Sequence, residues 1–246
     1  MHAQTILQLY RQLTDAGHDD PTLAQVRTAY ELARQLFVGC YRPSEKPFCA
    51  HLVGTASALA RWGERSDMVI AGLLHSAYLY GEFGDRTRGI SPAKQDVLSK
   101  RVGKQVEELV ACYSAIKEHP MGQLDGQAPD PQSRDVIVLK LADLYDECAD
   151  GGPLYSPEKT LWNGLPHNRD ARQVVLSIAR QLVSPTAQED LDSVFQEIDS
   201  RQVPEVLLNQ KQAYHTAQPG VPELRISKTR RRLGRLAKRF SPRRAA

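Results

Sequence analysis

Two histidines and one aspartate of this 246-residue chain stand in apolar stretches where ionisable groups are unusual. His51 lies in "PFCAHLVGTASALA", His75 in "AGLLHSAY" and Asp143 in "LKLADLYDECAD". Burying an imidazole or a carboxylate costs free energy unless the group is paired or bound to a metal. Singly, each residue is more often a core side chain satisfied by a hydrogen bond or by an arginine. Together, converging from separate helices, they would form a site suited to Mn, Fe or Zn.

The elements that must position these residues are expected to be helices. Apolar residues recur at helical spacing from end to end, and strand patterns are scarce. The segment 67–79 is apolar on nearly all sides, as is typical of a central helix. Ser91 and Pro92 are typical of a helix start, and Gly103 of a break. Helices are expected within 1–17, at 22–38, around 52–60, at 67–79, on either side of Gly103, and at 133–150, 169–183, 187–199 and 203–216, with loops at 118–132 and 151–168.

The distribution of charge divides the chain into a body and a tail. Residues 224–246 carry ten Lys and Arg residues and no acid. Removing these ten cations from the net charge of +3 leaves −7 for residues 1–223. We therefore expect an all-α domain over residues 20–216, followed over residues 217–246 by a linker and a basic amphipathic tail.

The composition also excludes several classes of protein. No apolar run approaches the roughly 20 residues that a membrane span needs, and the N-terminal segment has no signal-peptide core. A cytoplasmic location is expected. The four cysteines are scattered without a CxxC pair, so they predict buried reduced thiols rather than a zinc finger or a disulfide framework. They are Cys40, Cys49, Cys112 and Cys148.

Four motifs in the same order resemble the HD superfamily of metal-dependent phosphohydrolases. The nearest branch is the hydrolase domain of the RelA/SpoT-type (p)ppGpp enzymes, with R-x-x-G-E-P-Y-I-x-H-P, A-A-L-L-H-D and K-L-A-D. This chain has "RPSEKPFCAH", "AGLLHS" and "KLAD", and its "RVGKQVEELV" is similar to the family's F-G-x-x-V-x-x-L-V. The resemblance covers about residues 25–150. It implies an HD-domain-like helical bundle.

The resemblance also implies roles for particular residues. It makes His51, His75 and Asp143 the ligands of a divalent metal, with Mn, Fe and Zn as the candidates. Arg42 falls where the family has an arginine that contacts substrate. Lys46, in the same loop, would join Arg42 in holding the phosphates of the substrate.

The chain departs from the family's pattern at the residue after the second histidine. The family has a metal-binding aspartate there, whereas this chain has Ser76, whose hydroxyl is a poorer ligand. The family's E-D pair, which positions and activates water, aligns with Leu79 and Tyr80. Ser76 and Glu82 are the candidate catalytic residues that remain, and Glu82 would reach the cleft if the helix ends near Gly81. The alternative for Glu82 is a solvated loop carboxylate.

A second resemblance accounts for the serine. "HLVGTASALARWG" and "AGLLHSAYLYG" are similar to an uncharacterised HD-like group that reads H-L-x-G-T-x-x-L-L-x-x-W-G and A-G-L-F-H-S-x-Y-G. This resemblance is closer than that to the (p)ppGpp enzymes. It implies that Ser76 belongs to a variant branch with His-Ser in place of His-Asp.

Three functions are compatible with these residues. The first is a metal-dependent phosphohydrolase that acts on a nucleotide or another phosphorylated small molecule. The second is a catalytically degenerate HD-like binding or scaffold module. The third is an iron oxygenase on the same scaffold, which would need more histidines than the sequence offers. All three share one fold, so the fold cannot choose among them.

The basic tail raises a separate question of partners. Within residues 224–246, Ile226, Leu233, Leu236 and Phe240 recur at near-helical spacing among cations. Such a helix would bind an anionic membrane surface or the phosphates of a nucleic acid. The alternative is a solvated tail without a partner. Binding to lipid would place the cytoplasmic protein at the periphery of a membrane.

Overall fold

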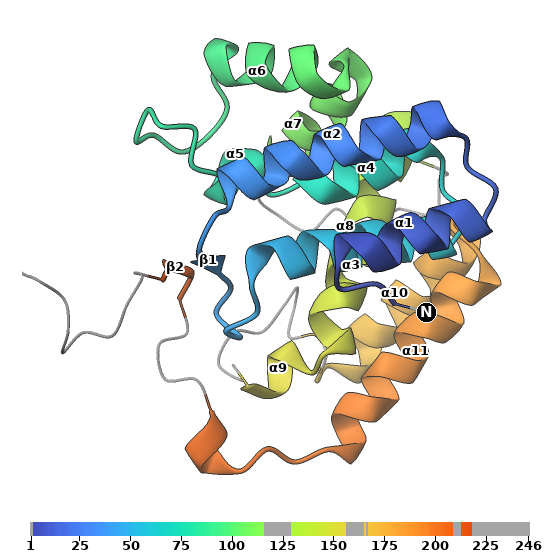
Figure 1. Cartoon of the computed structure of the whole chain (residues 1–246). Helices are drawn as coiled ribbons and strands as arrows, with labels where there is room; N and C mark the ends of the chain where they lie inside the picture. Colours follow the sequence, from blue (N-terminus) through green and yellow to red (C-terminus); the bar gives the residue numbers. More distant parts are fainter. Residues whose placement is uncertain (1, 116–128, 156–164, 166, 209–212, 218–246) are drawn as a thin grey trace, which may run out of the picture. The chain divides into compact units, whose positions relative to one another are not determined.

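Helix boundaries in the computed structural model follow local signals in the sequence (Figure 1). Thr5 accepts a hydrogen bond from the backbone N–H of Gln8, whose side chain bonds back to residue 5, which forms a capping box. Side chains of the same short polar type accept backbone hydrogen bonds at the starts of five later helices. These are Asp19, Ser91, Asp130, Asn168 and Ser184.

The structure describes residues 2–115, 129–155, 165, 167–208 and 213–217. Their helices before residue 116 are α1 (Ile6–Asp15), α2 (Asp20–Leu36), α3 (Phe48–Arg61), α4 (Ser66–Leu74), α5 (Ala77–Tyr80), α6 (Pro92–Val102) and α7 (Lys104–Ala115). The later ones are α8 (Pro131–Ala149), α9 (Gly152–Tyr155), α10 (Arg169–Leu182), α11 (Pro185–Ser200) and the 3-10 helix η2 (Glu205–Leu207). Two-residue strands β1 (Cys40–Tyr41) and β2 (His215–Thr216) pair antiparallel. The predicted all-α fold is confirmed.

Helix α3 is the centre of the packing. It lies against α4 and α8, while α1 and α2 pack on the same group of helices from the side shown at the front of Figure 1. Every residue of α3 from 51 to 59 is buried. Gly72 of α4 allows the closest approach, because a Cβ there would lie 3.0 Å from the Cα of Ala56. The small residues Gly72 and Ala56 therefore allow the backbones of α3 and α4 to pack closely.

The predicted central helix over residues 67–79 is interrupted. Helix α4 ends at Leu74, residues 75–76 form a turn, and α5 follows. Nδ1 of His75 lies 2.8 Å from the carbonyl oxygen of Gly72. In a continuous helix that carbonyl pairs with the N–H of Ser76. The His75 side chain thus competes with the backbone at the point where the helix breaks, a conflict that apolar periodicity does not register.

The helix predicted over residues 203–216 is wrong. Its described residues form η2, which buries none of its side chains, and then β2 beside β1. A helix this short gains its stability from burying an apolar face, and Leu207 is 55% exposed. Residues 205–207 have no buried face to support a longer helix, and residues 215–216 pair with β1 as an extended strand.

The compact unit spans Met1–Thr216, and Ala217–Ala246 forms a second unit. The first unit is longer than the predicted domain of residues 20–216, because α1 also belongs to it. Leu9 and Leu13 of α1 are fully buried, and the N–H of Ala3 donates to the hydroxyl of Ser57. The predicted basic tail lies outside the described residues from 218 onward.

Among the helices that the structure describes, none has both the length and the apolar character needed to cross a bilayer.

The four cysteines are free thiols, of which Cys40 and Cys148 are buried and Cys49 and Cys112 partly buried.

Asp190 of α11 provides a test of how the last helices hold α3. Its carboxylate accepts two hydrogen bonds from Arg61 and one, at 3.0 Å, from the indole N–H of Trp62. Asp190→Ala leaves the nearly buried indole N–H without this partner, so we expect the free energy of unfolding to fall by about 1–3 kcal/mol. Urea unfolding measures the change.

The matched control is Asp192→Ala on the same helix, since Asp192 has an exposed hydrogen bond to Gln196. It should change the free energy of unfolding by less than about 0.5 kcal/mol. Equal effects of the two substitutions would mean that Asp190 does not fasten α11 to α3.

Candidate metal centre

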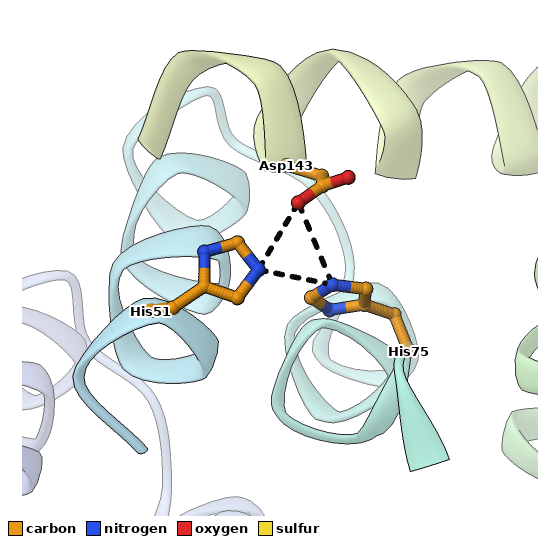
Figure 2. A group of neighbouring side chains, drawn as sticks. All are labelled: His51, His75 and Asp143. Atoms are coloured by element: carbon orange, nitrogen blue, oxygen red, sulfur yellow. Dashed lines mark hydrogen bonds and ion pairs between the residues drawn. The ribbon is translucent and has the colours of Figure 1, made fainter. Parts of the chain in front are cut away.

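Three potential ligand atoms converge from three helices (Figure 2). Nε2 of His51 from α3 lies 3.2 Å from Nε2 of His75, which follows α4. Oδ1 of Asp143 from α8 lies 3.0 Å from the first nitrogen and 3.6 Å from the second. Both histidines are fully buried, and 16% of the Asp143 side chain is exposed. The sequence prediction that these three residues meet is borne out by their geometry.

The outer nitrogens of the two rings fix which way each imidazole presents its lone pair. Nδ1 of His51 lies 2.7 Å from Oδ2 of Asp146, and Nδ1 of His75 lies 2.8 Å from the carbonyl oxygen of Gly72. Both oxygens are acceptors, so each Nδ1 carries the proton and donates it. In a neutral imidazole the other nitrogen then has a free lone pair. Each Nε2 therefore points a lone pair at the same place, as metal-ligating histidines do.

The third candidate ligand atom, Oδ1 of Asp143, lacks a hydrogen bond in the described part of the chain. Oδ1 of Asp143 is buried and has no hydrogen-bond partner among the described residues, although Nε2 of His51 is 3.0 Å away. A single proton could bridge the two imidazoles but would leave this oxygen unsatisfied. One cation would contact all three atoms. Nitrogen and oxygen donors about 2.0–2.2 Å from one ion are about 3–3.5 Å apart. Two of the separations here, 3.0 and 3.2 Å, fall in that range, and the third, 3.6 Å, lies just above it.

Asp146 holds His51 from behind and is itself strongly held. It is fully buried, and its two oxygens lie 2.9 and 2.8 Å from Nζ of Lys46. Nε2 of His2 and the amide of Gln4 also contact Oδ1, at 2.9 and 3.1 Å. Burial alone would raise the pKa of Asp146, but the Lys46 ammonium and the hydrogen bonds with His2 and His51 hold it well below its usual value. Asp146 is therefore an ionised carboxylate that orients the His51 ring.

Gly54 makes room for that carboxylate. A Cβ at residue 54 would lie 1.7 Å from Oδ1 and 2.5 Å from Cγ of Asp146. Gly54 is one turn after His51 on α3, so the absence of a side chain there opens the space through which Asp146 of α8 reaches the ring. The glycine of "HLVGT" thus has a structural reason within the site.

Tyr113 of α7 fixes the other oxygen of Asp143. Its hydroxyl donates to Oδ2 over 2.7 Å, and its ring packs edge-on to His75 with the centroids 4.9 Å apart. Burial and the neighbouring Asp143 carboxylate raise the pKa of Tyr113 well above its usual value, so the phenol keeps its proton. With Oδ2 committed to this hydrogen bond, Oδ1 is the atom that faces the histidines.

The predicted substrate-binding cations lie beside the cluster but are already paired. Arg42 is 5% exposed, contacts Glu147, and has one nitrogen 3.7 Å from Oδ1 of Asp143. Burial opposes its charge, yet Glu147 and the nearby acids raise its pKa further. Lys46 bridges Asp146 and Asp150. Both side chains therefore neutralise carboxylates of α8 in this structure.

The two candidate catalytic residues have different positions. Ser76 is 2% exposed, directly follows His75 in the turn, and makes no capping hydrogen bond with its side chain. Glu82 is not brought to the cluster: its side chain is 52% exposed and pairs with Arg88. The helix does end near Gly81, as expected, but the chain then runs along the surface, which matches the alternative of a solvated carboxylate.

Sequence reasoning missed the surroundings of the ligands. Asp146 was not among the predicted site residues, although it lies three residues after Asp143 and so shares its side of the helix. Apolar neighbours on that face were the available signal. The contributions of Tyr113 and His2 depend on how distant segments pack, and the sequence carries no local sign of either.

Access to the cluster is limited to one side. Asp143 is the ligand with exposed surface, so a substrate would approach there. A separate cavity of about 340 Å³ lies at the carboxyl end of α8 and does not include the three ligands. It is lined by Cys148, Ala149, Asp150, Gly151, Leu154, Tyr155, Glu197, Ile198, Arg201, Gln202, Val203 and Pro204. Its lining lacks the convergent ligand atoms, so the cluster is the better candidate for chemistry.

Comparison with known families gives a match of unassigned function. A family model described as a domain of unknown function, DUF6817, matches residues 35–118. This region contains Arg42, His51 and His75, whereas Asp143 lies beyond it. No curated protein matches the chain. The fold and the site define the chain as an all-α helical protein with a buried His-His-Asp cluster that fits a metal ion.

Gly54→Ala tests whether the site depends on the path of Asp146. The added methyl group would displace a carboxylate that is held by Lys46 and two histidines, so the clash outweighs the better helix propensity of alanine. We expect the free energy of unfolding to fall by about 2–4 kcal/mol, measured by urea unfolding.

Lys104→Ala on α7 serves as the control, because 83% of the Lys104 side chain is exposed. It should change the free energy of unfolding by no more than about 0.5 kcal/mol. If Gly54→Ala were as stable as the unmodified protein, Asp146 could not occupy the space next to residue 54.

Proposed function

We propose that this protein is an HD-like metal-dependent phosphohydrolase acting on a nucleotide or another phosphorylated small molecule. The observation that carries the proposal is the convergence of two imidazole lone pairs and an unpartnered carboxylate oxygen on one point. The motifs that contain these atoms follow the order of the HD phosphohydrolases. The metal is supported by the geometry, and the reaction class by that resemblance.

The charge around the cluster also supports a divalent cation. Three carboxylates of α8 and that of Asp150, directly after the helix, pair with two cations from the segment between β1 and α3. The carboxylates are Asp143, Asp146, Glu147 and Asp150, and the cations are Arg42 and Lys46. With neutral imidazoles these six groups keep two unbalanced negative charges, of which the nearby Lys140 offsets one, and such charges are costly in a mostly buried site. A divalent ion would balance them.

The proposed mechanism assigns each contact a task. A divalent metal held by His51, His75 and Asp143 would polarise a phosphoryl oxygen and lower the pKa of a water molecule. Asp146 and the Gly72 carbonyl keep the two rings in the tautomer that offers Nε2. Tyr113 holds Asp143 with Oδ1 inward. The Arg42 guanidinium, 3.7 Å from that oxygen, adds positive charge where an anionic phosphoryl group would bind.

A non-catalytic HD-like module is the second candidate, and a specific observation favours it. Ser76 occupies the position of the family's metal-binding aspartate, and Glu82 points to solvent. A site with three protein ligands and no additional acid could bind a metal or a ligand without turnover. The two candidates share the fold and differ in metal content and hydrolysis.

Elemental analysis of the purified protein is the test. We expect near-stoichiometric Mn, Fe or Zn in the unmodified protein and loss of the metal in the His51→Ala, His75→Ala double variant. His167→Ala, which changes an exposed histidine, should retain the metal. Hydrolysis of a panel of phosphorylated nucleotides and phosphomonoesters should depend on the same two histidines.

The outcomes separate the candidates. Metal with hydrolysis would support the enzyme, whereas metal without hydrolysis of any panel member would favour the binding module. If the unmodified protein contained no metal after incubation with Mn, Fe and Zn ions, the phosphohydrolase proposal would be refuted. In that case the two histidines are core residues joined by a hydrogen bond.

Asp146→Asn tests the support of the ligands rather than the ligands themselves. The amide keeps the shape of the side chain but removes the charge that stabilises His51. We expect metal affinity to fall about 10- to 100-fold, measured by competition with a chelator. Asp192→Asn on the surface of α11 should leave the affinity unchanged. Equal affinities of the Asp146→Asn and unmodified proteins would refute a role for Asp146 in metal binding.

A further inference from the structure

Lys140 is a buried cation that the proposed mechanism does not use. It lies on α8 one turn before Asp143 and is 8% exposed. Its ammonium nitrogen sits over the ring of Tyr113, 4.2 Å from the centroid. The same Tyr113 ring contacts His75, and its hydroxyl donates to Asp143. One aromatic side chain therefore touches Lys140 and two of the three candidate ligands.

The pairing of Lys140 differs from that of the other buried lysines. Lys46 forms ion pairs with two aspartates, and Lys94 donates to the backbone oxygens of residues 87 and 89 and to the Thr87 hydroxyl. Within the described part of the chain, the ammonium of Lys140 forms neither a hydrogen bond nor an ion pair. Burial lowers its pKa, and the Asp143 carboxylate opposes that shift.

Such a group is expensive to keep for packing alone. Most of the Lys140 side chain is buried, and the face of the Tyr113 ring gives its ammonium an electrostatic contact but no hydrogen-bond acceptor. An apolar side chain of similar length would fill the same space without this cost. An anion would add the charged acceptor that the described residues around Lys140 do not supply.

The net charge around Lys140 indicates that a ligand bound there would be an anion. Once a divalent ion joins Arg42 and Lys46, the carboxylates of Asp143, Asp146, Glu147 and Asp150 are balanced, and Lys140 adds one further positive charge beside Tyr113. A phosphoryl group carries oxygen acceptors and negative charge, so it would satisfy both the charge and the N–H donors. Arg42 and Lys46, the cations predicted to hold substrate, already have carboxylate partners.

We propose that Lys140 and the Tyr113 ring form an anionic subsite, in which the Lys140 ammonium binds a phosphoryl group of the substrate beside the three metal ligands. This inference rests on the proposed function, because the metal ion completes the charge balance. Lys140 is a substrate-binding residue in this role and donates hydrogen bonds without giving up a proton.

The test is binding of inorganic phosphate to the Mn²⁺-loaded full-length protein. Titration followed by ³¹P relaxation detects phosphate near the paramagnetic ion and so ignores phosphate bound elsewhere on the surface. We expect Lys140→Met to weaken phosphate binding about 10- to 100-fold with metal content unchanged. Lys140→Arg, which keeps a charged donor, should restore most of the affinity.

Lys104→Met is the matched control, since its lysine is exposed on α7 and should bind phosphate like the unmodified protein. Circular dichroism and thermal unfolding verify that Lys140→Met is folded, and removal of an unpaired buried charge should leave its midpoint equal or higher.

Unchanged phosphate binding in Lys140→Met, or no phosphate binding by the metal-loaded unmodified protein, would overturn the subsite while leaving the metal centre intact. Failure of the unmodified protein to bind Mn²⁺, Fe or Zn would instead remove the proposed function and the subsite with it.

Discussion

The hydrogen bond between Asp146 and His51 is the constraint on which the site depends. It fixes the proton of His51 on the outer nitrogen and so directs the inner lone pair toward His75 and Asp143. The bond exists because Gly54 leaves space for the carboxylate and because Lys46 keeps it ionised in a buried position. Asp146, Gly54 and Lys46 are not among the three candidate ligands, yet they determine which atom of His51 is available to bind a metal.

Helix α8 joins two needs that usually conflict. Its apolar side chains belong to the core, whereas three of its carboxylates and that of its C-cap Asp150 lie at or beside the cluster of His51, His75 and Asp143. The cost of burying acids is reduced because each has a cationic or hydrogen-bonding partner from another segment. The partners come from the β1–α3 segment, from α7 and from the start of the chain, so the site and the packing of the helices support each other.

Much of the fold was predictable from the sequence because helix starts are local events. Ser91, Asp130 and similar residues mark them by their own side-chain chemistry, and periodic apolar residues locate the buried faces. That His51, His75 and Asp143 meet was predictable because ionisable groups in apolar helices need partners. The break at His75 was not predicted, because the bond between its side chain and the Gly72 carbonyl leaves the apolar periodicity unchanged. The strand at 215–216 was not predicted, because it depends on pairing with the distant β1. Asp146 was predictable in part. Its spacing from Asp143 places both residues on one face of α8, but its bond to His51 follows from the packing of α3 against α8.

The separation of the three ligands along the chain has a thermodynamic consequence. His51, His75 and Asp143 come from helices that meet only in the folded state, so an ion bound by all three would act as a cross-link between distant parts of the polypeptide. Ligand that binds the native state alone raises stability with concentration, by about 1.4 kcal/mol for each tenfold excess over its dissociation constant. The folded fraction of the protein would then depend on the concentration of free metal. A shortage of metal would lower the amount of folded protein even if its synthesis stayed constant.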